Sequence, residues 1–312
     1  MKHYLAIDVG GTHIKYALMQ EDGAIISSDK MVTPKRSLEA FLTSLFDIIT
    51  PYQEELSGVA FSVPGKVDTH TGTIYFGGAL TYLDRLCLKQ VIQERYNLPA
   101  SVQNDAKAAA LAELWLGSLK GVSDAAVIVL GTGVGGSIIL DGQLRMGPHF
   151  QAGELSLSVL EASKPEVEKM VGFIGSAVLM IEKVNQAIGH PDLKDGQTAF
   201  QAISKGDTRA LPIFQTYCRQ IAYLILNLQA FLDLSTYAIG GGISSQPLLI
   251  EEINRQFSKV IEGSPLLSMN VADLAIIPTH FGNDANLYGA LYQFLEEHNN
   301  LSTDKTVSIT DK

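Results

Sequence analysis

Cysteine is scarce in this sequence, which contains only Cys87 and Cys218. Because these two residues lie far apart along the chain, they provide neither a disulfide framework nor a cysteine-based zinc site. Both fall in segments with a helical pattern, where we expect them to be small residues of the core. The lack of a disulfide framework favours a cytoplasmic protein.

Long apolar runs and basic clusters are also missing. Glycine or polar residues interrupt every apolar stretch before it reaches bilayer length, and the N-terminal MKHYLAID has no apolar signal-peptide core. The chain has 33 acidic and 23 basic residues, a formal net charge of −10, and no cluster of lysine and arginine. We therefore expect no membrane partner, and no nucleic-acid partner because a nucleic-acid-binding face is basic.

What is present is an ordinary globular composition, with 46% hydrophobic and 18% charged residues in 312 positions. The length predicts about two domains. The first third of the chain has the order β-β-β-α-β-α-β-α, which indicates an α/β layered domain. The expected strands are 3–8, 13–19, 24–27, 56–65 and a short one within 99–105, and the expected helices are 37–51, 84–97 and 104–117.

The pattern of the opening segment occurs a second time. Residues 125–147 repeat residues 4–26 in order and spacing: strand, glycine turn, strand, Asp-Gly turn, strand. This similarity predicts an internal duplication. Helices at 166–188 and 208–231 follow, then a strand, a helix with Pro247 in its first turn, and a final strand and helix.

This order predicts two lobes and a tail. We expect a small N-terminal lobe of residues 1–116, with a C-terminal helix at 285–298 packing back on it, and a large lobe of residues 117–284. Residues 299–312 are polar and without periodicity, so we expect a disordered tail.

Three glycine turns each follow an apolar strand, at residues 10–12, 131–136 and 240–242. Glycine permits a positive φ and close approach of a ligand, and successive backbone N–H groups bind phosphate. A tight hairpin is the alternative for any single turn. No Walker loop is present, because no turn continues as Gly-Lys-Ser/Thr. GTGVGG fits the dinucleotide motif GxGxxG, but a strand rather than a helix is expected after it, which argues against a dehydrogenase site.

Carboxylates lie beside these turns. Asp8 ends the first strand, where it suits Mg²⁺ directly or through a water, or holds an Asx turn. Asp105 follows Asn104 at a helix start, so it is a general base or a helix cap, and the two residues can divide these roles. His149 and Glu154 lie in GPHFQAGELS, a loop of a kind that often binds small molecules. The alternative for His149 is an ordinary loop histidine or a partly buried one.

The motifs taken together resemble the ROK sugar kinases of the actin-like ATPase superfamily. DVGGTHIK (8–15) and GTGVGGSIILDG (131–142) resemble the two phosphate loops of that family, and GGGIS (240–244) resembles its adenosine loop. VPGKVDTHTG (63–72), NDAKAAALAE (104–113) and AGEL (152–155) resemble the sugar-side loop, the catalytic Asn-Asp and the sugar-binding glutamate segment. The matches occur in order from residue 5 to about residue 292.

The resemblance implies an α/β fold of the actin-like ATPase (ribonuclease H-like) type, with two duplicated lobes and a central cleft. It implies transfer of the γ-phosphoryl group of ATP, with Mg²⁺, to a hexose hydroxyl, typically O6, and a homodimer. Asp105 is then the catalytic base. The implied sugar-binding residues are Gly65, Asn104, Asp105, Glu154 and His149. The implied ATP-binding residues are Asp8, Gly10, Gly11, Thr12, Lys15, Thr132, Gly133, Gly241 and Gly242, with Asp8 also supporting the metal.

Two departures from the family pattern are visible. The zinc-binding histidine and cysteines of many members are absent, with Leu157 at the histidine position, so we expect no zinc and a different hold on the anomeric end of the sugar. Glu168 either matches a second sugar-binding glutamate or is a solvent-facing charge. YFGGALTYLDRL lacks the Asn-Leu-x-x-Trp element of glucose-specific members. The chain is therefore similar to the zinc-free subgroup with β-glucoside and N-acetylmannosamine kinases, and we expect a wider pocket at C1 or C2.

Two other functions compete with the kinase. Transcriptional repressors of the family carry a winged-helix domain before the first phosphate loop, and here the first strand starts at about residue 3. A non-catalytic sugar sensor is expected to lose Asp105 or the phosphate-loop glycines, and this chain keeps both. The sequence therefore predicts an ATP-dependent kinase for a hexose, a β-glucoside or N-acetylmannosamine.

Overall fold

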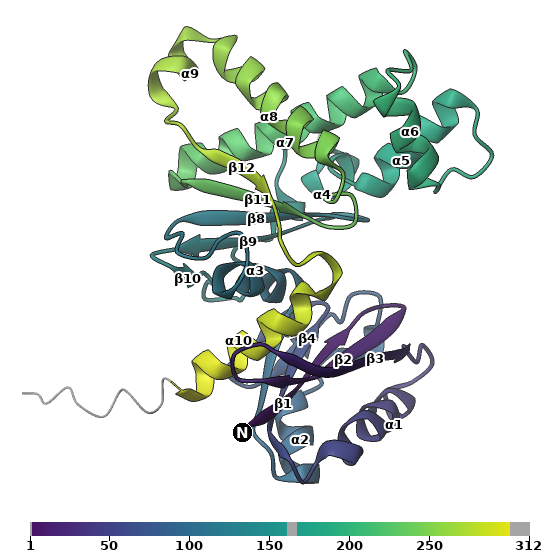
Figure 1. The fold of residues 1–312 in the computed structure, drawn as a ribbon, viewed down its shortest axis with the longest axis vertical. Helices are drawn as coiled ribbons and strands as arrows, with labels where there is room; N and C mark the ends of the chain where they lie inside the picture. Colours follow the sequence, from purple (N-terminus) through teal and green to yellow (C-terminus); the bar gives the residue numbers. More distant parts are fainter. Residues whose placement is uncertain (1, 161–166, 300–312) are drawn as a thin grey trace, which may run out of the picture. The chain divides into compact units, whose positions relative to one another are not determined.

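A computed structural model describes residues 2–160 and 167–299 (Figure 1). The chain forms two compact units. The first unit comprises Met1–Trp115, Gly147–Gln151 and Asp284–Lys312, and the second comprises Leu116–Met146 and Ala152–Asn283. The last helix thus belongs to the unit of the N-terminal strands. The tail that the sequence predicts to be disordered lies outside the described residues from position 300 onward.

A five-stranded sheet with the order β3-β2-β1-β4-β7 organises the first unit. β1 is antiparallel to β2 and parallel to β4, β2 is antiparallel to β3, and β4 is parallel to β7. The strands are β1 (His3–Val9), β2 (His13–Gln20), β3 (Ile25–Val32), β4 (Leu56–Val63) and β7 (Ala100–Asn104). The predicted α/β layered architecture is confirmed.

Helices cover both faces of this sheet. Successive residues of β1 point to opposite faces, so they are buried in two different cores. Leu5 packs in one core with Phe41 of α1, and Tyr4 packs in another with Phe294 of α10. A strand buried on both faces reads as a nearly continuous apolar run, as β1 does. The helices of the first unit are α1 (Leu38–Ile49), α2 (Leu88–Tyr96), α3 (Asp105–Trp115) and α10 (Ala285–Asn299).

The second unit repeats the sheet topology of the first. Its strand order is β10-β9-β8-β11-β12, with β8 antiparallel to β9 and parallel to β11, β9 antiparallel to β10, and β11 parallel to β12. The strands are β8 (Ala125–Leu130), β9 (Val134–Leu140), β10 (Gln143–Leu144), β11 (Thr236–Gly240) and β12 (Ala275–Pro278). The same pairing in the same chain order confirms the internal duplication that the sequence predicts.

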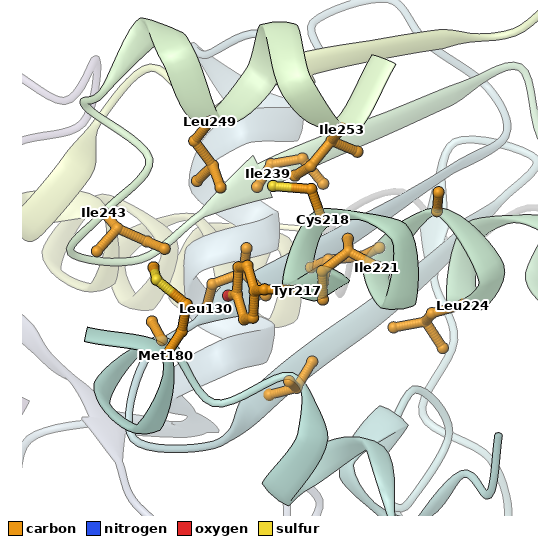
Figure 2. Close-up of a cluster of buried hydrophobic side chains, with 14 of the residues drawn as sticks. Leu130, Met180, Tyr217, Cys218, Ile221, Leu224, Ile239, Ile243, Leu249 and Ile253 are labelled. Carbon is orange, nitrogen blue, oxygen red and sulfur yellow. The ribbon is translucent and has the colours of Figure 1, made fainter. Parts of the chain in front are cut away.

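The core of the second unit is formed by its sheet with the helices α5, α6, α7 and α8, and Figure 2 shows part of it. Cys218 of α7 packs there with Ile239 of β11 and Ile253 of α8. Cys218 is the core residue that the sequence predicts, and burial raises the pKa of its thiol. The helices of this unit are α4 (Val171–Ile174), α5 (Ala177–Ile188), α6 (Gly196–Ser204), α7 (Leu211–Leu232), α8 (Pro247–Glu262) and α9 (Pro265–Asn270).

Short elements connect the main ones. They are the hairpin β5 (Lys66–Asp68) and β6 (Thr73–Tyr75) and the 3₁₀ turns η1 (Thr50–Tyr52), η2 (Thr81–Leu83), η3 (Leu155–Leu157), η4 (Val167–Lys169) and η5 (Gly282–Asp284). Glu168 lies in η4 with its side chain exposed. In the part of the chain that the structure describes, no helix combines the length and hydropathy that crossing a bilayer requires.

Three sequence predictions of local structure are wrong. The helix expected over 166–188 is interrupted after α4, because Gly175 leaves the helical conformation and the Ser176 Oγ accepts a hydrogen bond from Leu179 N at 3.2 Å, starting a new helix. The helix expected over 84–97 begins only at Leu88, since Arg85 has a φ of +64°. Cys87 therefore precedes the helix, is only half-buried, and donates from Sγ to the Thr71 carbonyl at 3.0 Å.

Candidate active site

Asp8 lies at the carboxyl end of β1, and its side chain is only 9% exposed. Its Oδ1 accepts hydrogen bonds from Ser62 Oγ of β4 at 3.0 Å and from Asn286 Nδ2 of α10 at 2.9 Å. Two elements far from the first hairpin in sequence thus hold this carboxylate. Its contacts extend beyond the Asx turn considered from the sequence.

The surroundings of Asp8 only partly compensate its negative charge. Burial raises the pKa of Asp8, the hydrogen bonds from Asn286 and Ser62 and the charge of Lys15 lower it, and Asp284 raises it further; the net shift is upward. The Lys15 ammonium also lies 3.8 Å from the Asp284 carboxylate, so its charge is shared. A buried carboxylate in this state favours a nearby cation.

The first glycine turn is compact because its backbone folds closely onto His13. Gly10 N donates to the His13 carbonyl at 3.0 Å, and a Cβ on Gly10 would lie 2.9 Å from that same oxygen. Thr33 donates to the carbonyls of Gly10 and Thr12 at 2.6 and 3.0 Å, which fixes the turn. Gly11 and Thr12 are exposed.

A positive φ does not explain why glycine stands at most positions of these turns. Neither Gly10 nor Gly11 has a positive φ, and the same holds for Gly131 and Gly133. Glycine is needed in the first turn because the hairpin backbone approaches too closely for a Cβ. Of the residues proposed for ATP, only Gly241 has a φ in the left-handed region, at +97°.

Asn104 and Asp105 divide the roles at the start of α3. Asn104 Oδ1 accepts from Lys107 N at 3.2 Å, which is the contact of a helix cap. Asn104 Nδ2 donates to the Gly65 carbonyl at 2.8 Å and to Asp105 Oδ1 at 2.9 Å. The same Asp105 oxygen accepts from Ala106 N at 2.7 Å. The Asp105 carboxylate is therefore oriented by its cap residue and by the helix backbone.

Gly65 must be glycine in this structure. Its φ is +92°, and a Cβ there would lie 2.7 Å from the Tyr75 carbonyl and 2.8 Å from Gly77 N. The chain after β6 runs from Gly65 toward the first glycine turn, where the Ala79 Cβ would lie 3.8 Å from a Cβ on Gly11. The sugar-side loop and the first phosphate loop of the sequence prediction are thus linked through residues 75–79.

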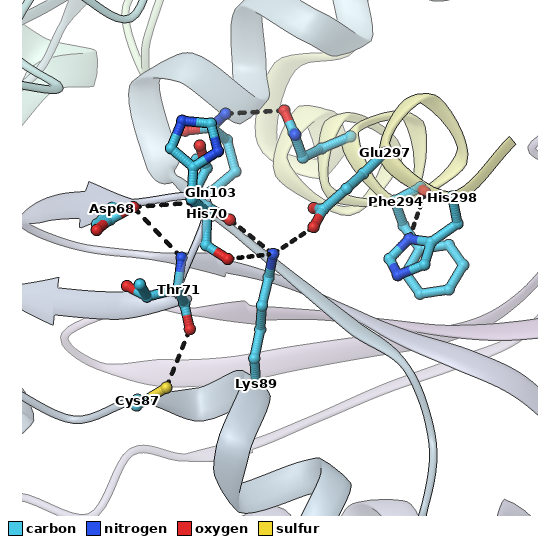
Figure 3. Close-up of polar contacts among 11 residues, drawn as sticks. Asp68, His70, Thr71, Cys87, Lys89, Gln103, Phe294, Glu297 and His298 are labelled. Carbon is cyan, nitrogen blue, oxygen red and sulfur yellow. Dashed lines mark hydrogen bonds and ion pairs between the residues drawn. The ribbon is translucent and has the colours of Figure 1, made fainter. Parts of the chain in front are cut away.

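The turn of the β5–β6 hairpin is anchored by polar contacts (Figure 3). Lys89 Nζ donates to the Thr69 carbonyl at 2.6 Å and forms an ion pair with Glu297 of α10. Asp68 Oδ1 accepts from the backbone N of His70 at 2.9 Å. The hairpin next to Gly65 is therefore tied to α2 and α10, which restricts its movement.

His149 belongs to the first unit, with Asp105, because residues 147–151 pack there. The ring of the adjacent Phe150 lies 5.9 Å from that of His70 in an edge-to-face arrangement. His149 itself is exposed. The structure thus brings the predicted His149 segment to the β5–β6 hairpin.

The second glycine turn is held by the start of α5. The Gly131 carbonyl accepts from Ala177 N at 2.9 Å, and Gly131 N donates to the Gly133 carbonyl at 3.0 Å. Thr132 is exposed at the tip. Strand β9 follows directly, which confirms that GTGVGG is not a dinucleotide-binding motif.

Glu154 lies in the second unit, in the segment between β10 and η3. The preceding Gly153 has a φ of +82°, and a Cβ there would lie 2.9 Å from the Ser137 Cα of β9. The Glu154 side chain is exposed at the start of η3. This close packing holds the backbone before Glu154 against β9, the strand that follows the turn of Thr132.

The third glycine turn borders a cavity of about 600 Å³ in the second unit. Gly241 contacts the Leu130 carbonyl so closely that a Cβ would collide with it, and the Gly241 carbonyl accepts from Ser244 N at 3.0 Å. Gly242 and Ile243 line the cavity on one side, and Phe200 and Gln201 of α6 line it on another. The cavity is large enough for a nucleoside.

The ROK family model matches residues 4–297. The chain belongs to the ROK family. It is 28% identical over 303 residues to a β-glucoside kinase of Klebsiella pneumoniae, covering 96% of this chain and 98% of the relative. It is 31% identical over 302 residues to an N-acetylmannosamine kinase of Vibrio cholerae, covering 94% and 99%. A crystal structure of a ROK family protein from Streptococcus pneumoniae TIGR4 in complex with sucrose is 30% identical, with a TM-score of 0.87 and coverage of 96% and 99%.

The ROK fold is the actin-like ATPase fold, which agrees with the two repeated sheets. In residues 2–160 and 167–299 there is no group of three or more His, Cys, Asp and Glu side chains that could hold a metal ion. Residues 161–166, which belong to the segment without zinc-binding cysteines, lie outside the described residues.

Sequence reasoning missed several residues of this candidate site. Ser62 and Asn286 hold Asp8, and Asp284 forms an ion pair with Lys15, a residue that the sequence does predict. The polar run before the last helix, FGNDAN, is the only sequence signal for Asn286. The sequence patterns do not predict helix α6. The cavity-lining residues Phe200 and Gln201 of this helix therefore could not be identified from the sequence.

Proposed function

We propose that this ROK protein is an ATP-dependent sugar kinase that transfers the γ-phosphoryl group to a hexose hydroxyl, O6, with Asp105 as general base. The observation that carries the proposal is the linked cluster of Asp105, Asn104 and Gly65. A carboxylate oriented by an amide and a helix backbone, beside the backbone of Gly65, suits the deprotonation of a bound hydroxyl.

In the proposed reaction Asp105 accepts the proton of the sugar hydroxyl. The hydroxyl oxygen forms its bond to the γ-phosphorus while the bond from that phosphorus to the β,γ-bridging oxygen breaks, and ADP leaves with the electron pair. Asn104 is proposed to hold Asp105 and to contact the sugar ring. The catalytic gain comes mainly from positioning of the two reactants.

The phosphate groups are proposed to bind at the two glycine turns that open the repeated sheets. Gly10, Gly11 and Thr12 contribute from the first unit with Lys15, and Thr132 and Gly133 contribute from the second. Their exposed backbone, fixed by Thr33 in one turn and by α5 in the other, supports this assignment.

Asp8 is proposed to support Mg²⁺, directly or through a water. The buried oxygen donor, with its raised pKa, fits such an ion, and one or two carboxylates with substrate phosphates are the usual ligands of Mg²⁺ in kinases. Bound Mg²⁺ would neutralise charge on the phosphates. Asn286 and Ser62 hold Asp8 in place for this role.

The nucleoside is proposed to lie in the cavity beside Gly241 and Gly242, with Phe200 of α6 as an apolar wall. The sugar is proposed to contact Gly65, Asn104, Glu154 and His149. The proposed substrates are a hexose, a β-glucoside or N-acetylmannosamine, and the names of the relatives support this range.

A coupled ADP-release assay with MgATP and a panel of sugars tests the proposal. The panel contains glucose, mannose, N-acetylglucosamine, N-acetylmannosamine, cellobiose and an aryl β-glucoside. We expect ADP release that depends on one or more of these sugars and a phosphosugar product that mass spectrometry detects. A protein that binds ATP but turns over none of the panel contradicts the proposal.

A further inference from the structure

Phe76 has an unusual conformation for a bulky residue. Its φ is +63°, in the left-handed region that phenylalanine seldom adopts, and its side chain is 74% exposed. Phe76 N donates to Asp84 Oδ1 at 2.9 Å, and the Phe76 carbonyl accepts from Gly78 N. The surrounding contacts therefore hold the backbone in a conformation that the side chain itself disfavours.

The ring gains no stability from the core in return for this conformation. Backbone strain that the surrounding structure maintains is concentrated at functional sites. An exposed, strained aromatic residue is therefore a candidate for ligand contact, provided that it lies at a site.

Phe76 does lie at the proposed active site. Its two neighbours, Tyr75 and Gly77, approach Gly65 so closely that a Cβ on Gly65 would lie 2.7 Å from the Tyr75 carbonyl and 2.8 Å from Gly77 N. Three residues further on, Ala79 approaches Gly11 of the first phosphate loop. The Phe76 backbone thus passes between the loop proposed for the sugar and the loop proposed for phosphate.

A cation lies beside this aromatic residue. The Lys66 ammonium is 4.9 Å from the centroid of the Tyr75 ring and 6.0 Å from that of Phe76. An aromatic face with an adjacent ammonium group offers an apolar surface and hydrogen-bond donors together. A pyranose ring presents an apolar C–H face and hydroxyls at its rim, so it matches both features.

We propose that Phe76 is a specificity-determining residue that stacks against the second ring of a β-linked glycoside, the first ring being the hexose that is phosphorylated. This inference rests on the proposed kinase function and narrows its substrate class. A β-linkage is equatorial in glucosides, so it extends the second ring in the plane of the first and presents a flat face to the aromatic ring. The second ring is a pyranose or an aryl group, since both have such a face.

Kinetics with Phe76→Ala and Phe76→Trp test the proposal. We expect F76A to lower the ratio of kcat/KM for cellobiose to kcat/KM for glucose at least tenfold, mainly through KM for cellobiose, and F76W to retain most of the wild-type ratio. An aryl β-glucoside should follow cellobiose, whereas the α-linked maltose should not. Phe231→Ala is the matched control, because Phe231 is also exposed, at 83%, and lies on α7 in the other unit.

Equilibrium binding separates failure of this inference from failure of the kinase proposal. Calorimetric titration with cellobiose, without ATP, should show at least tenfold weaker binding to F76A than to wild type. If wild type binds cellobiose at least tenfold more tightly than F76A does but transfers no phosphate, the kinase proposal is wrong and the role of Phe76 stands. If wild type is an active kinase and F76A changes neither the kinetic ratio nor the affinity by more than twofold, the role of Phe76 is refuted.

Discussion

Asn286 Nδ2 donates a hydrogen bond to Asp8 Oδ1 at 2.9 Å, although 278 positions separate the two residues. The contact connects the start of the C-terminal helix α10 to the end of the first strand. Asn286 also lowers the pKa of Asp8 against the larger effect of burial. The last helix thus takes part in the proposed metal site as well as in the core of the first unit.

Asn286→Ala is expected to weaken the binding of Mg²⁺ that the reaction requires. A hydrogen bond to a charged group contributes about 1.5–3 kcal/mol, so the Mg²⁺ concentration for half-maximal activity should rise roughly tenfold or more. The pKa of Asp8 rises further without its amide donor, so the acid limb of the pH profile should move to higher pH. Initial rates over Mg²⁺ and pH series measure both effects.

Asn270→Ala is the control for this variant, since Asn270 is exposed on α9 and far from any proposed role. If N286A keeps the wild-type Mg²⁺ concentration for half-maximal activity and the wild-type acid limb of the pH profile, Asn286 serves packing only.

Asp8→Asn is expected to raise stability and to lower activity. The pKa of Asp8 is raised in the folded protein, so ionisation of its carboxyl group opposes folding. The stability that comes from the neutral form is fully present below the pKa of Asp8 in the unfolded chain. It is lost as pH rises through the pKa of Asp8 in the folded protein. At pH 7 the variant avoids this cost, so its melting temperature should exceed that of wild type. The difference should shrink as pH falls toward about 4, the ordinary pKa of aspartic acid.

Thermal unfolding of D8N and wild type from pH 4 to pH 8, with and without Mg²⁺, measures this effect. Mg²⁺ with ATP should raise the melting temperature of wild type, because a ligand stabilises the folded state that binds it. The rise should be smaller for D8N, which lacks the carboxylate proposed to support Mg²⁺. If the melting temperature of D8N lies below that of wild type at pH 7, the hydrogen bonds and charges around Asp8 fully offset the cost of burying its carboxylate.

Much of the fold could be predicted from the sequence because local patterns specify it. The alternation of apolar residues identifies the strands, and the repeat of residues 4–26 at 125–147 identifies the duplication, which the matching strand orders confirm. The β5–β6 hairpin escapes prediction because its strands have only three residues each and polar turn residues separate them. The segment after residue 166 resembles one helix in sequence because its apolar pattern continues through the cap at Ser176.

The environment of the site could be predicted less well. The positions of Asp8 and Asn104 follow from local rules, since a polar residue after a buried strand and an amide before a helix are recognisable. Ser62 and Asn286 reach Asp8 because β4 pairs with β1 and α10 packs in the first unit. We expect the return of this helix from the sequence, but no local pattern places its Asn286 or the Ser62 of β4 beside Asp8. The first turn needs glycine for contact with His13, and that contact also depends on the folded hairpin.

Asp105→Asn is expected to lower kcat by several orders of magnitude while sugar binding survives. The amide oxygen of asparagine can still accept from Ala106 N, so the helix start is preserved, but the side chain cannot take up the proton of the sugar hydroxyl. Single-turnover rates and calorimetric sugar binding measure the two properties separately. Asp273→Asn, an exposed carboxylate before β12, controls for the change of charge. A near-wild-type rate would remove Asp105 from the chemical step.

Gly65→Ala is expected to destabilise the protein and to raise KM for the sugar. Two separate costs act at Gly65: a φ of +92° and contact of the new methyl group with the backbone of Tyr75 and Gly77. Gly121→Ala isolates the first cost, because Gly121 has a φ of +80° and no atom within 4 Å of its Cβ position. We expect about 1 kcal/mol of destabilisation for G121A and about 2–3 kcal/mol or more for G65A.

The same pair of variants tests whether Gly65 matters for the substrate. If the methyl group displaces residues 75–77, the Asn104 contact with the Gly65 carbonyl shifts as well, and KM for the sugar should rise at least tenfold in G65A but not in G121A. Denaturant unfolding gives the free energies, and steady-state kinetics at saturating ATP give KM. Equal losses of stability in the two variants would mean that the loop yields to the methyl group, and an unchanged KM in a folded G65A would separate the loop from the sugar.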